Sequence, residues 1–238
     1  MIVFGVNFNL YYLMLLRRFK IVFKSEELRV FLAIVAVSTV IMGINATEYY
    51  GDFSVAIRKA FFQTGAIIST TGFGGVEFMN WPMLCHSVIL VLLFTGACAG
   101  STAGGIKISR IIMMFKMLRK ESHRLAHPHE ITTIKFEGKI VDKETRSFIM
   151  VYISAFFAIL AVSSIAVMMA GHDYETAFTA TLSCINNVGP GLGEIGHSGY
   201  FGFFNGGTKI FLSLLMLTGR LEIFPILILF MPSTWRKH

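Results

Sequence analysis

The sequence predicts an all-α integral membrane protein, built as two tandem helix–loop–helix repeats with part of a further helix at the N-terminus. Composition is the first reason: 54% of the 238 residues are hydrophobic and 15% are charged, whereas soluble domains average about 25% charged. Second, several apolar runs reach the roughly 20 residues that span a bilayer. Third, the chain contains an internal repeat with a constant offset.

The N-terminal half is expected to hold part of one helix and one complete repeat. Residues 1–24 are interpreted as the end of a preceding transmembrane helix and a cytoplasmic turn, because an apolar run stops at Arg17. Residues 25–125 then form the first repeat, whose second helix is broken. Its expected elements are a span at residues 28–47, a short helix at 53–68, and a long segment from 81 to about 118 interrupted at 96–105.

Residues 126–238 are expected to form a cytoplasmic loop and the second repeat. The polar stretch 119–146 contains His123, His127 and His129. We interpret it as solvated, because no helix or strand is expected to gather these side chains into a metal site. No CxxC pair occurs among the three cysteines, which argues against zinc or a disulfide framework. The expected elements of the second repeat are spans at residues 148–170 and 208–231 and a short apolar run at 174–183.

The formal net charge of +7 is a signal of membrane topology. Basic residues gather in three stretches, 17–29, 116–146 and 236–237, and the turns near Gly51 and Gly171 carry few. In membrane proteins, Lys and Arg residues are enriched in the loops on the cytoplasmic side. We therefore expect a multi-pass protein of the cytoplasmic (inner) membrane, in contact with the lipid bilayer and not with nucleic acid.

The repeat is seen most clearly from Gly72 and Gly189, which lie 117 residues apart (189 − 72). At the same offset, Ala60-Phe61 matches Ala177-Phe178, Thr64 matches Thr181, and Arg29 matches Arg146. Each copy starts and ends on the cytoplasmic side, so the two copies have parallel topology. The predicted fold is therefore two tandem helix–pore loop–helix repeats of potassium-channel type.

Two glycine-containing loops follow the short helices and carry the predicted ion site. The negative dipole ends of these helices would face the bilayer middle, where exposed carbonyls need water or a cation. Carbonyls of Thr70, Thr71, Asn187 and Val188 are candidate ligands for a potassium ion. The alternative is a pair of purely structural re-entrant turns. The filter residues assigned are Ser69, Thr70, Thr71, Gly72, Phe73, Asn186, Asn187, Val188, Gly189 and Pro190.

A second small-residue stretch interrupts the long segment of the first repeat. Its match to a phosphate-binding loop is weak, because no Ser or Thr follows Lys107 and no βα unit surrounds it. We interpret it as a broken helix that lines a water-filled path below the filter; the alternative is a helix-packing patch. The gate residues assigned are Gly100, Ser101, Thr102, Ala103, Gly104, Gly105 and Lys107, together with Arg220.

Arg220 lies in an otherwise apolar last span, about 18 Å along a helix that starts at Thr208. A charge inside the membrane costs about 2.5 kcal/mol or more, so it usually faces a cavity or a partner. We expect Arg220 to meet the loop at residues 100–105 as a cationic obstacle. The alternative is a structural pair with Glu222, although residues two apart do not face each other on a helix.

Three motifs, at residues 100–107, 187–193 and 219–222, resemble the Trk/Ktr/HKT superfamily of potassium transporters, and within it TrkH-type membrane subunits. The resemblance covers nearly the whole chain. It implies four repeats around one pore, of which this chain resembles the third and fourth, the C-terminal half. It also implies filter glycines Gly72 and Gly189, the gate-facing Arg220, a homodimer, and a cytosolic nucleotide-binding regulatory ring.

The predicted function is potassium uptake across the membrane, with K⁺ as the transported ion and no covalently bound cofactor. Two loops cannot make a four-sided filter. Missing N-terminal repeats are therefore the favoured explanation, and a second copy of the chain is the other. The alternative function is a non-conducting fragment or assembly and regulatory half of a transporter. Neither paired carboxylates nor a nucleophile–base set is evident in the sequence, so an enzyme is not expected.

Overall fold

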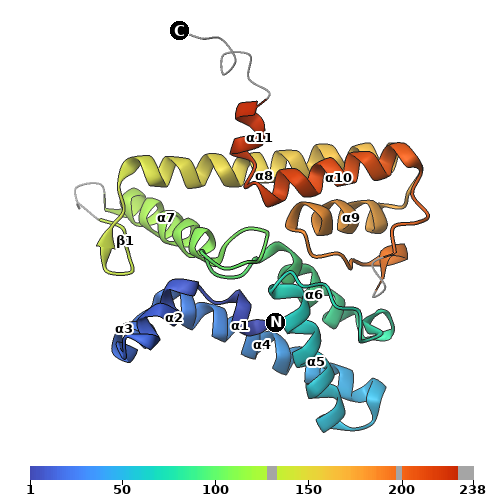
Figure 1. Ribbon diagram of the computed structural model, residues 1–238, viewed down its shortest axis with the longest axis horizontal. Helices are drawn as coiled ribbons and strands as arrows, with labels where there is room; N and C mark the ends of the chain where they lie inside the picture. The colour runs from blue at the N-terminus through green and yellow to red at the C-terminus, as the bar shows by residue number, and fades with distance from the viewer. Residues whose placement is uncertain (128–132, 197–199, 230–238) are drawn as a thin grey trace.

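The computed structural model describes residues 1–127, 133–196 and 200–229, which are mainly helical (Figure 1). The N-terminal half contains α1 (Ile2–Gly5), α2 (Phe8–Leu15), α3 (Phe19–Lys24), α4 (Glu26–Tyr50), α5 (Phe53–Ile68), the 3₁₀ helix η1 (Phe78–Asn80), α6 (Met83–Phe94) and α7 (Ile108–Ala126). The C-terminal half contains β1 (Lys135–Phe136), β2 (Lys139–Ile140), α8 (Lys143–Met169), α9 (Tyr174–Asn186), the 3₁₀ helix η2 (Gly193–Ile195), α10 (Gly206–Arg220) and α11 (Phe224–Leu229).

The same order of elements occurs twice. α4 and α8 are long helices, α5 and α9 are the short helices that follow them, and each short helix leads through an irregular loop to a broken helix, α6–α7 or α10–α11. α5 packs against α4, and α9 packs against both α8 and α10. In Figure 1 α9 lies below α8 and α10. The predicted fold class, an all-α membrane protein of two tandem repeats, is confirmed.

Side chains fix where the main helices begin. A side-chain oxygen accepts a hydrogen bond from a backbone N–H of the first turn, which satisfies a donor that has no partner within the helix. Helix α4 ends at Gly51, whose φ of 71° is a conformation that favours glycine. The residues that cap α4, α5, α8, α9 and α10 in this way are Ser25, Asp52, Asp142, Asp173 and Asn205.

Two of the described helices, α4 with 25 residues and α8 with 27, are long and apolar enough to cross a membrane. Both expose apolar side chains along one face, which suits contact with lipid tails. These side chains, between 47% and 68% exposed, are Leu32, Val37, Val40 and Ile44 on α4 and Val151, Phe157, Val162 and Ile165 on α8. The segment expected at residues 81–118 is indeed interrupted, and α6 contributes a 12-residue apolar piece.

The last span differs from the prediction. A single helix was expected over residues 208–231, with Arg220 well inside it, and this is wrong. α10 ends at Arg220 itself, and Glu222 and Ile223 have φ values of 57° and 64°, so the chain turns before α11 begins. Pro225 explains part of the break, because a proline within a continuous helix lacks an N–H and its ring clashes with the carbonyl four residues earlier, here that of Leu221. Met231 lies outside the described residues.

The second short helix is longer than expected. α9 runs to Asn186, three residues beyond the predicted end at Ser183. Asn186 is therefore the last residue of a helix and is not part of the extended loop. The helix stops there because Asn187 adopts a left-handed conformation, which asparagine tolerates better than most residues.

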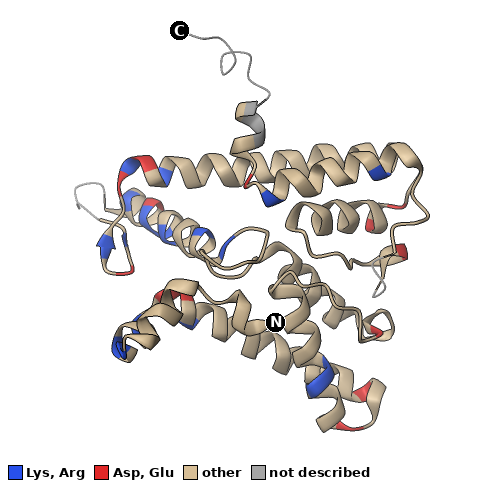
Figure 2. Cartoon of the chain, viewed as in Figure 1, with Lys and Arg blue, Asp and Glu red and all other residues tan. Residues whose placement is uncertain are grey.

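The polar stretch between the two halves also has more structure than the sequence indicated. α7 continues to Ala126, and β1 and β2 form an antiparallel hairpin, so the expectation of a loop without framework is wrong. His123 and His127 stack with ring centroids 4.7 Å apart, and His129 lies outside the described residues. No group of three or more potential metal ligands occurs in the part of the chain that the structure describes. Figure 2 shows Lys and Arg gathered over α3, α7, the hairpin and the start of α8.

Candidate functional site

The first loop (residues 69–73) and the second loop (residues 187–190) leave their helices with the same backbone geometry. Thr70 and Asn187 have φ values of 52° and 55°, and Gly72 and Gly189 have φ values of 66° and 108°. Both pairs are separated by the repeat offset. A positive φ is a genuine outlier for a β-branched residue such as Thr70. The repetition of an unfavourable conformation indicates that the fold imposes it at both positions.

Backbone hydrogen bonds turn each loop back onto the end of its own helix. The Thr71 N–H donates to the Ala66 carbonyl at 3.0 Å, and the equivalent Val188 N–H donates to the Ser183 carbonyl at 3.0 Å. The N–H groups are thus satisfied within each repeat. The carbonyls of the loop residues take no part in these bonds.

Those carbonyls accept no hydrogen bond from any described residue. Of these residues Val188 is buried, Thr71 is exposed, and the others are partly buried. A carbonyl without a protein partner is left to bind water or an ion. The helix C-terminus adds negative potential of its own. The arrangement suits a cation. The unpaired oxygens belong to Thr70, Thr71, Gly72, Asn187, Val188 and Gly189.

The two loops lie in direct contact, although 117 residues separate them in sequence. A Cβ built on Gly72 would overlap the carbonyl oxygen of Val188 and would lie 3.1 Å from Cδ of Pro190. Pro190 is buried, and its ring faces the first loop at Gly72. Only glycine fits at position 72, because of both its positive φ and the close approach of the neighbouring backbone.

The remaining predicted residues of the loops have different surroundings. Ser69 is the C-cap of α5, and its hydroxyl donates to the Gly65 carbonyl at 2.6 Å. The Asn186 amide is buried and donates to the Leu93 carbonyl on α6 at 2.5 Å. Phe73 is 61% exposed and makes no part of the contact between the loops.

The break between α6 and α7, residues 95–107 (the helix-break loop), is closed by its own backbone. The Gly96 N–H donates to the Ile106 carbonyl at 2.8 Å. The buried Lys107 ammonium donates to the Ala103 carbonyl inside the loop. The Ser101 hydroxyl donates to the Cys98 carbonyl at 2.6 Å. The loop is therefore a compact, internally bonded unit.

The tip of the helix-break loop lies against both glycine loops. The Gly104 N–H donates to the Thr70 hydroxyl at 2.9 Å. A Cβ on Gly104 would overlap the carbonyl oxygen of Asn186, and one on Gly105 would lie 3.0 Å from the Asn186 amide oxygen. The helix-break loop and the two glycine loops thus form one connected site, brought together from three separate stretches of sequence.

Arg220 reaches the same loop from α10. Its guanidinium Nη1 donates to the Thr102 carbonyl at 3.0 Å. Between them is a cavity of about 230 Å³, lined by Ser101, Thr102, Ala103, Gly104, Gly105, Lys107, Gly219, Arg220 and Glu222. The predicted meeting of Arg220 with the loop therefore occurs, and the alternative pair with Glu222 does not form, because Glu222 pairs with Arg110 on α7.

Three contributors to this site were missed in the sequence. The Ser183 hydroxyl accepts the Gly189 N–H at 2.9 Å and fixes the second loop from within α9. Gly219 lets α10 approach α9, since a Cβ there would overlap the Ile185 carbonyl oxygen. Arg110 stacks on the Tyr152 ring at 4.0 Å and holds Glu222. Of these, Gly219 had a sequence signal, because it directly precedes Arg220.

The repeated fold, with its two inward loops and the broken helix beneath them, defines a membrane protein of the helix–pore loop–helix class. The family model of TrkH, a cation transport protein, matches residues 7–237. The chain belongs to this family, as the resemblance of its motifs predicted.

Individual relatives agree with this assignment. The Trk system potassium uptake protein TrkH of Escherichia coli (strain K12) is 32% identical over 242 residues, which is 100% of this chain and 49% of the relative. TrkH of Vibrio parahaemolyticus is 34% identical over 220 residues, 92% of this chain and 45% of the relative. The crystal structure of the potassium transporter TrkH from Vibrio parahaemolyticus matches with a TM-score of 0.88 at 32% identity, covering 99% of this chain and 51% of that one. The chain spans about half the length of the curated relatives it matches.

Proposed function

We propose that this chain supplies two of the four sides of a pore that carries potassium into the cell. The observation that carries the proposal is the pair of equivalent loops, in contact with each other, whose carbonyl oxygens accept no hydrogen bond from the described residues. Related proteins of this family are named as potassium uptake proteins, which supports K⁺ as the transported ion.

In this proposal, main-chain oxygens of Thr70, Thr71, Asn187 and Val188 replace part of the hydration shell of K⁺. The ion stands where the carboxyl ends of α5 and α9 converge, so both helix dipoles favour it. Gly72 and Gly189 allow the backbone to turn so that these oxygens face one axis. The protein needs no covalent chemistry and no covalently bound cofactor for this, and we do not propose an enzymatic activity.

The helix-break loop and Arg220 act as the gate below this filter. The loop tip touches both filter loops at Gly104, so the ion path past the filter must pass the loop. Arg220 adds a positive charge beside the path, and its bond to Thr102 keeps the loop in place. A conducting state therefore requires that the loop move and that Arg220 release it.

The transporter that we propose is a four-repeat pore in the cytoplasmic membrane. In this pore, residues 1–24 are the end of a preceding transmembrane helix and a cytoplasmic turn. Residues 25–125 form one repeat, and residues 126–238 form the cytoplasmic loop and the other repeat. The two remaining sides come from further repeats or from a second copy of the chain. A homodimer of membrane subunits and a cytosolic nucleotide-binding ring complete the transporter, with the basic segments over α3, α7 and the hairpin on the cytoplasmic side.

Potassium uptake in a host that lacks its own uptake systems tests the proposal. The protein expressed from its full coding sequence should restore growth at low K⁺, and Gly189→Ser should reduce uptake or the discrimination between K⁺ and Na⁺. Gly189 has a φ of 108°, so serine would distort the second loop. Uptake and selectivity that do not change in this variant would overturn the filter assignment.

The second candidate is a non-conducting assembly or regulatory half, which the presence of two loops instead of four favours. The discriminating measurement is K⁺ flux into liposomes that contain this chain alone. Flux that requires no other segment would support pairing of two copies. The absence of flux, together with capture of a complementary membrane segment, would support the assembly role.

A further inference from the structure

A buried carboxylate fastens the helix-break loop at its base. Glu27, in the first turn of α4, is 5% exposed. Its Oε1 accepts the Ala99 N–H at 2.7 Å and the Ser109 N–H at 3.1 Å. Ala99 lies within the helix-break loop and Ser109 lies just after it, at the start of α7. One oxygen atom therefore joins the two limbs of the loop.

The surroundings explain why an acidic residue is needed at position 27. Ser109 belongs to the first turn of α7, whose N–H groups have no partner within the helix and favour negative charge. A carboxyl oxygen has two lone pairs and can accept two N–H groups at once, as this one does. Burial of a carboxylate is costly unless such bonds compensate for it. Glu27 thus supplies an acceptor to the first turn of α7, and the two N–H groups in turn compensate for the burial of its carboxyl group.

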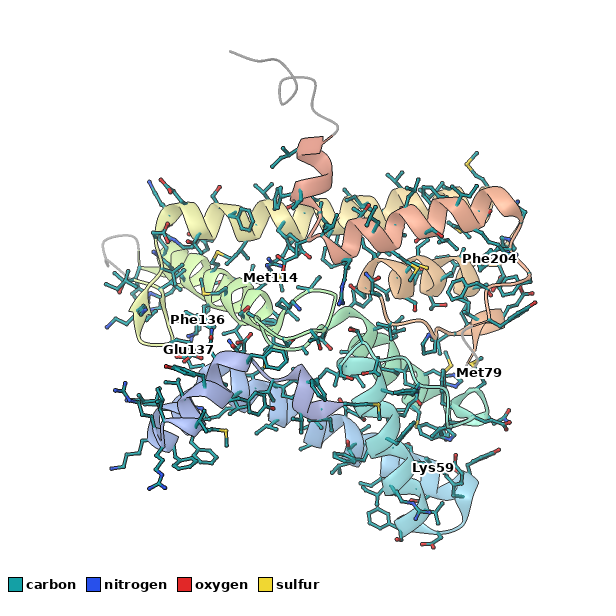
Figure 3. The ribbon with its side chains drawn as sticks, in the orientation of Figure 1. Lys59, Met79, Met114, Phe136, Glu137 and Phe204 are labelled. Carbon is teal, nitrogen blue, oxygen red and sulfur yellow. The ribbon has the colours of Figure 1, made fainter. Side chains whose placement is uncertain are left out.

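The hairpin is attached to the same turn of α4. Glu137 occupies the turn between β1 and β2 with a φ of 49°. Its Oε1 accepts the Ser25 hydroxyl at 2.9 Å and the Glu27 N–H at 3.2 Å. Figure 3 shows the labelled Glu137 where the hairpin comes down onto the N-terminal helices. Residue 27 is thus held by the hairpin through its backbone and holds the loop through its side chain.

A second contact strengthens this attachment. Lys116 on α7 forms an ion pair with Glu26, and its ammonium also donates to the Lys135 carbonyl of β1 at 2.8 Å. The hairpin, α7 and the start of α4 therefore meet at one polar junction. At this junction, Glu27 is the residue whose side chain bonds directly to the helix-break loop.

We propose that Glu27 is the positioning residue of the helix-break loop and that Glu137 couples the position of the hairpin to it. Displacement of the hairpin removes the Glu137 acceptor from the Glu27 N–H, disturbs the first turn of α4, and so loosens the loop. The consequence for ion flow rests on the proposed gate function. The positioning itself does not, because it concerns the loop's structure alone.

Cys98 provides a reporter for the loop that does not depend on conduction. It lies in the helix-break loop beside Ala99 and has no exposed surface. With Cys85 and Cys184 replaced by Ala, the rate at which a water-soluble maleimide labels Cys98 in membranes measures how often the loop opens. The variants are Glu27→Ala, Glu27→Gln and Glu137→Gln. Glu48→Gln is the matched control, because Glu48 is also an acidic residue of α4, yet it is exposed at the opposite end of that helix, away from the loop.

We expect Glu27→Ala to raise the labelling rate about tenfold or more, since it removes both hydrogen bonds that join the limbs of the loop. Glu27→Gln, which keeps the shape of the side chain, and Glu137→Gln should raise it less, and Glu48→Gln should leave it unchanged. The Gln variants keep the test decisive should Glu27→Ala fail to fold. Labelling of all Glu27 variants at the unsubstituted rate would overturn the positioning role, as would an equal increase in Glu48→Gln.

Flux recordings on the same variants separate this inference from the gate. Faster labelling with altered K⁺ flux supports both. Faster labelling with unaltered flux keeps the positioning role and refutes the gate function. Altered flux without faster labelling refutes the positioning role.

Discussion

Replacement of Gly72 by alanine tests the contact between the two loops most sharply. Two costs follow from the structure. Its φ of 66° imposes a left-handed conformation on alanine, at about 1–2 kcal/mol. The new Cβ would also overlap the Val188 carbonyl oxygen. An ordinary carbon–oxygen contact is about 3.3 Å, so this oxygen must move by on the order of 1 Å.

Gly51→Ala is the matched control for this substitution. Gly51 has a φ of 71°, and nothing lies within 4 Å of a Cβ built on it, so it has the backbone cost without the overlap. A carbonyl displaced from the ion path loses its contact with the ion. Loss of even about 1.4 kcal/mol changes ion occupancy about tenfold. We expect Gly72→Ala to lower K⁺ uptake at least that much at equal expression, and Gly51→Ala to leave uptake nearly unchanged. Equal effects of the two substitutions would refute the reasoning.

Three further predictions concern other parts of the site and the helix that supports it. Arg220→Ala should raise K⁺ flux in single-channel or liposome recordings, because the cationic obstacle is gone; equal or lower flux would count against the gate. Gly219→Ala should lower the melting temperature in detergent, because a Cβ would overlap the Ile185 carbonyl oxygen; an unchanged melting temperature would show that α10 does not pack so closely. Hydrogen bonds from Thr145 lower the pKa of Asp142. This cap on α8 should therefore be fully effective above the ordinary carboxyl pKa and be lost as pH falls through the lowered value, seen as faster amide exchange at Thr145; exchange protection that persists at acid pH would contradict it.

Much of the fold could be predicted because its strongest signals are local. The short helix at Phe53–Ile68 ends where β-branched residues and glycines follow, and the structure has the same bounds. The repeat offset placed Gly72 and Gly189 at equivalent points of the two loops, although α9 extends three residues beyond its predicted end. Periodicity could not show the break after Arg220, because the residues on either side are apolar and helix-compatible. Pro225 was the available signal.

The connections within the site were not predictable from local pattern. Glu27 meets Ala99 and Ser109, and Glu137 meets Ser25, over separations of 72 to 112 residues. Such pairs depend on how helices pack, and no spacing rule in the sequence encodes them. The hairpin itself had a weak signal in Gly138, whose φ of 78° completes its two-residue turn.

The most direct test of the central claim is to locate the ion. Anomalous scattering from rubidium, used in place of potassium in crystals of the protein expressed from its full coding sequence, would mark its position. The account predicts a peak between the two loops in contact with carbonyl oxygens of Thr70, Thr71, Asn187 and Val188, and its loss in Gly189→Ser. Rubidium bound only to side chains elsewhere, with none between the loops, would contradict it.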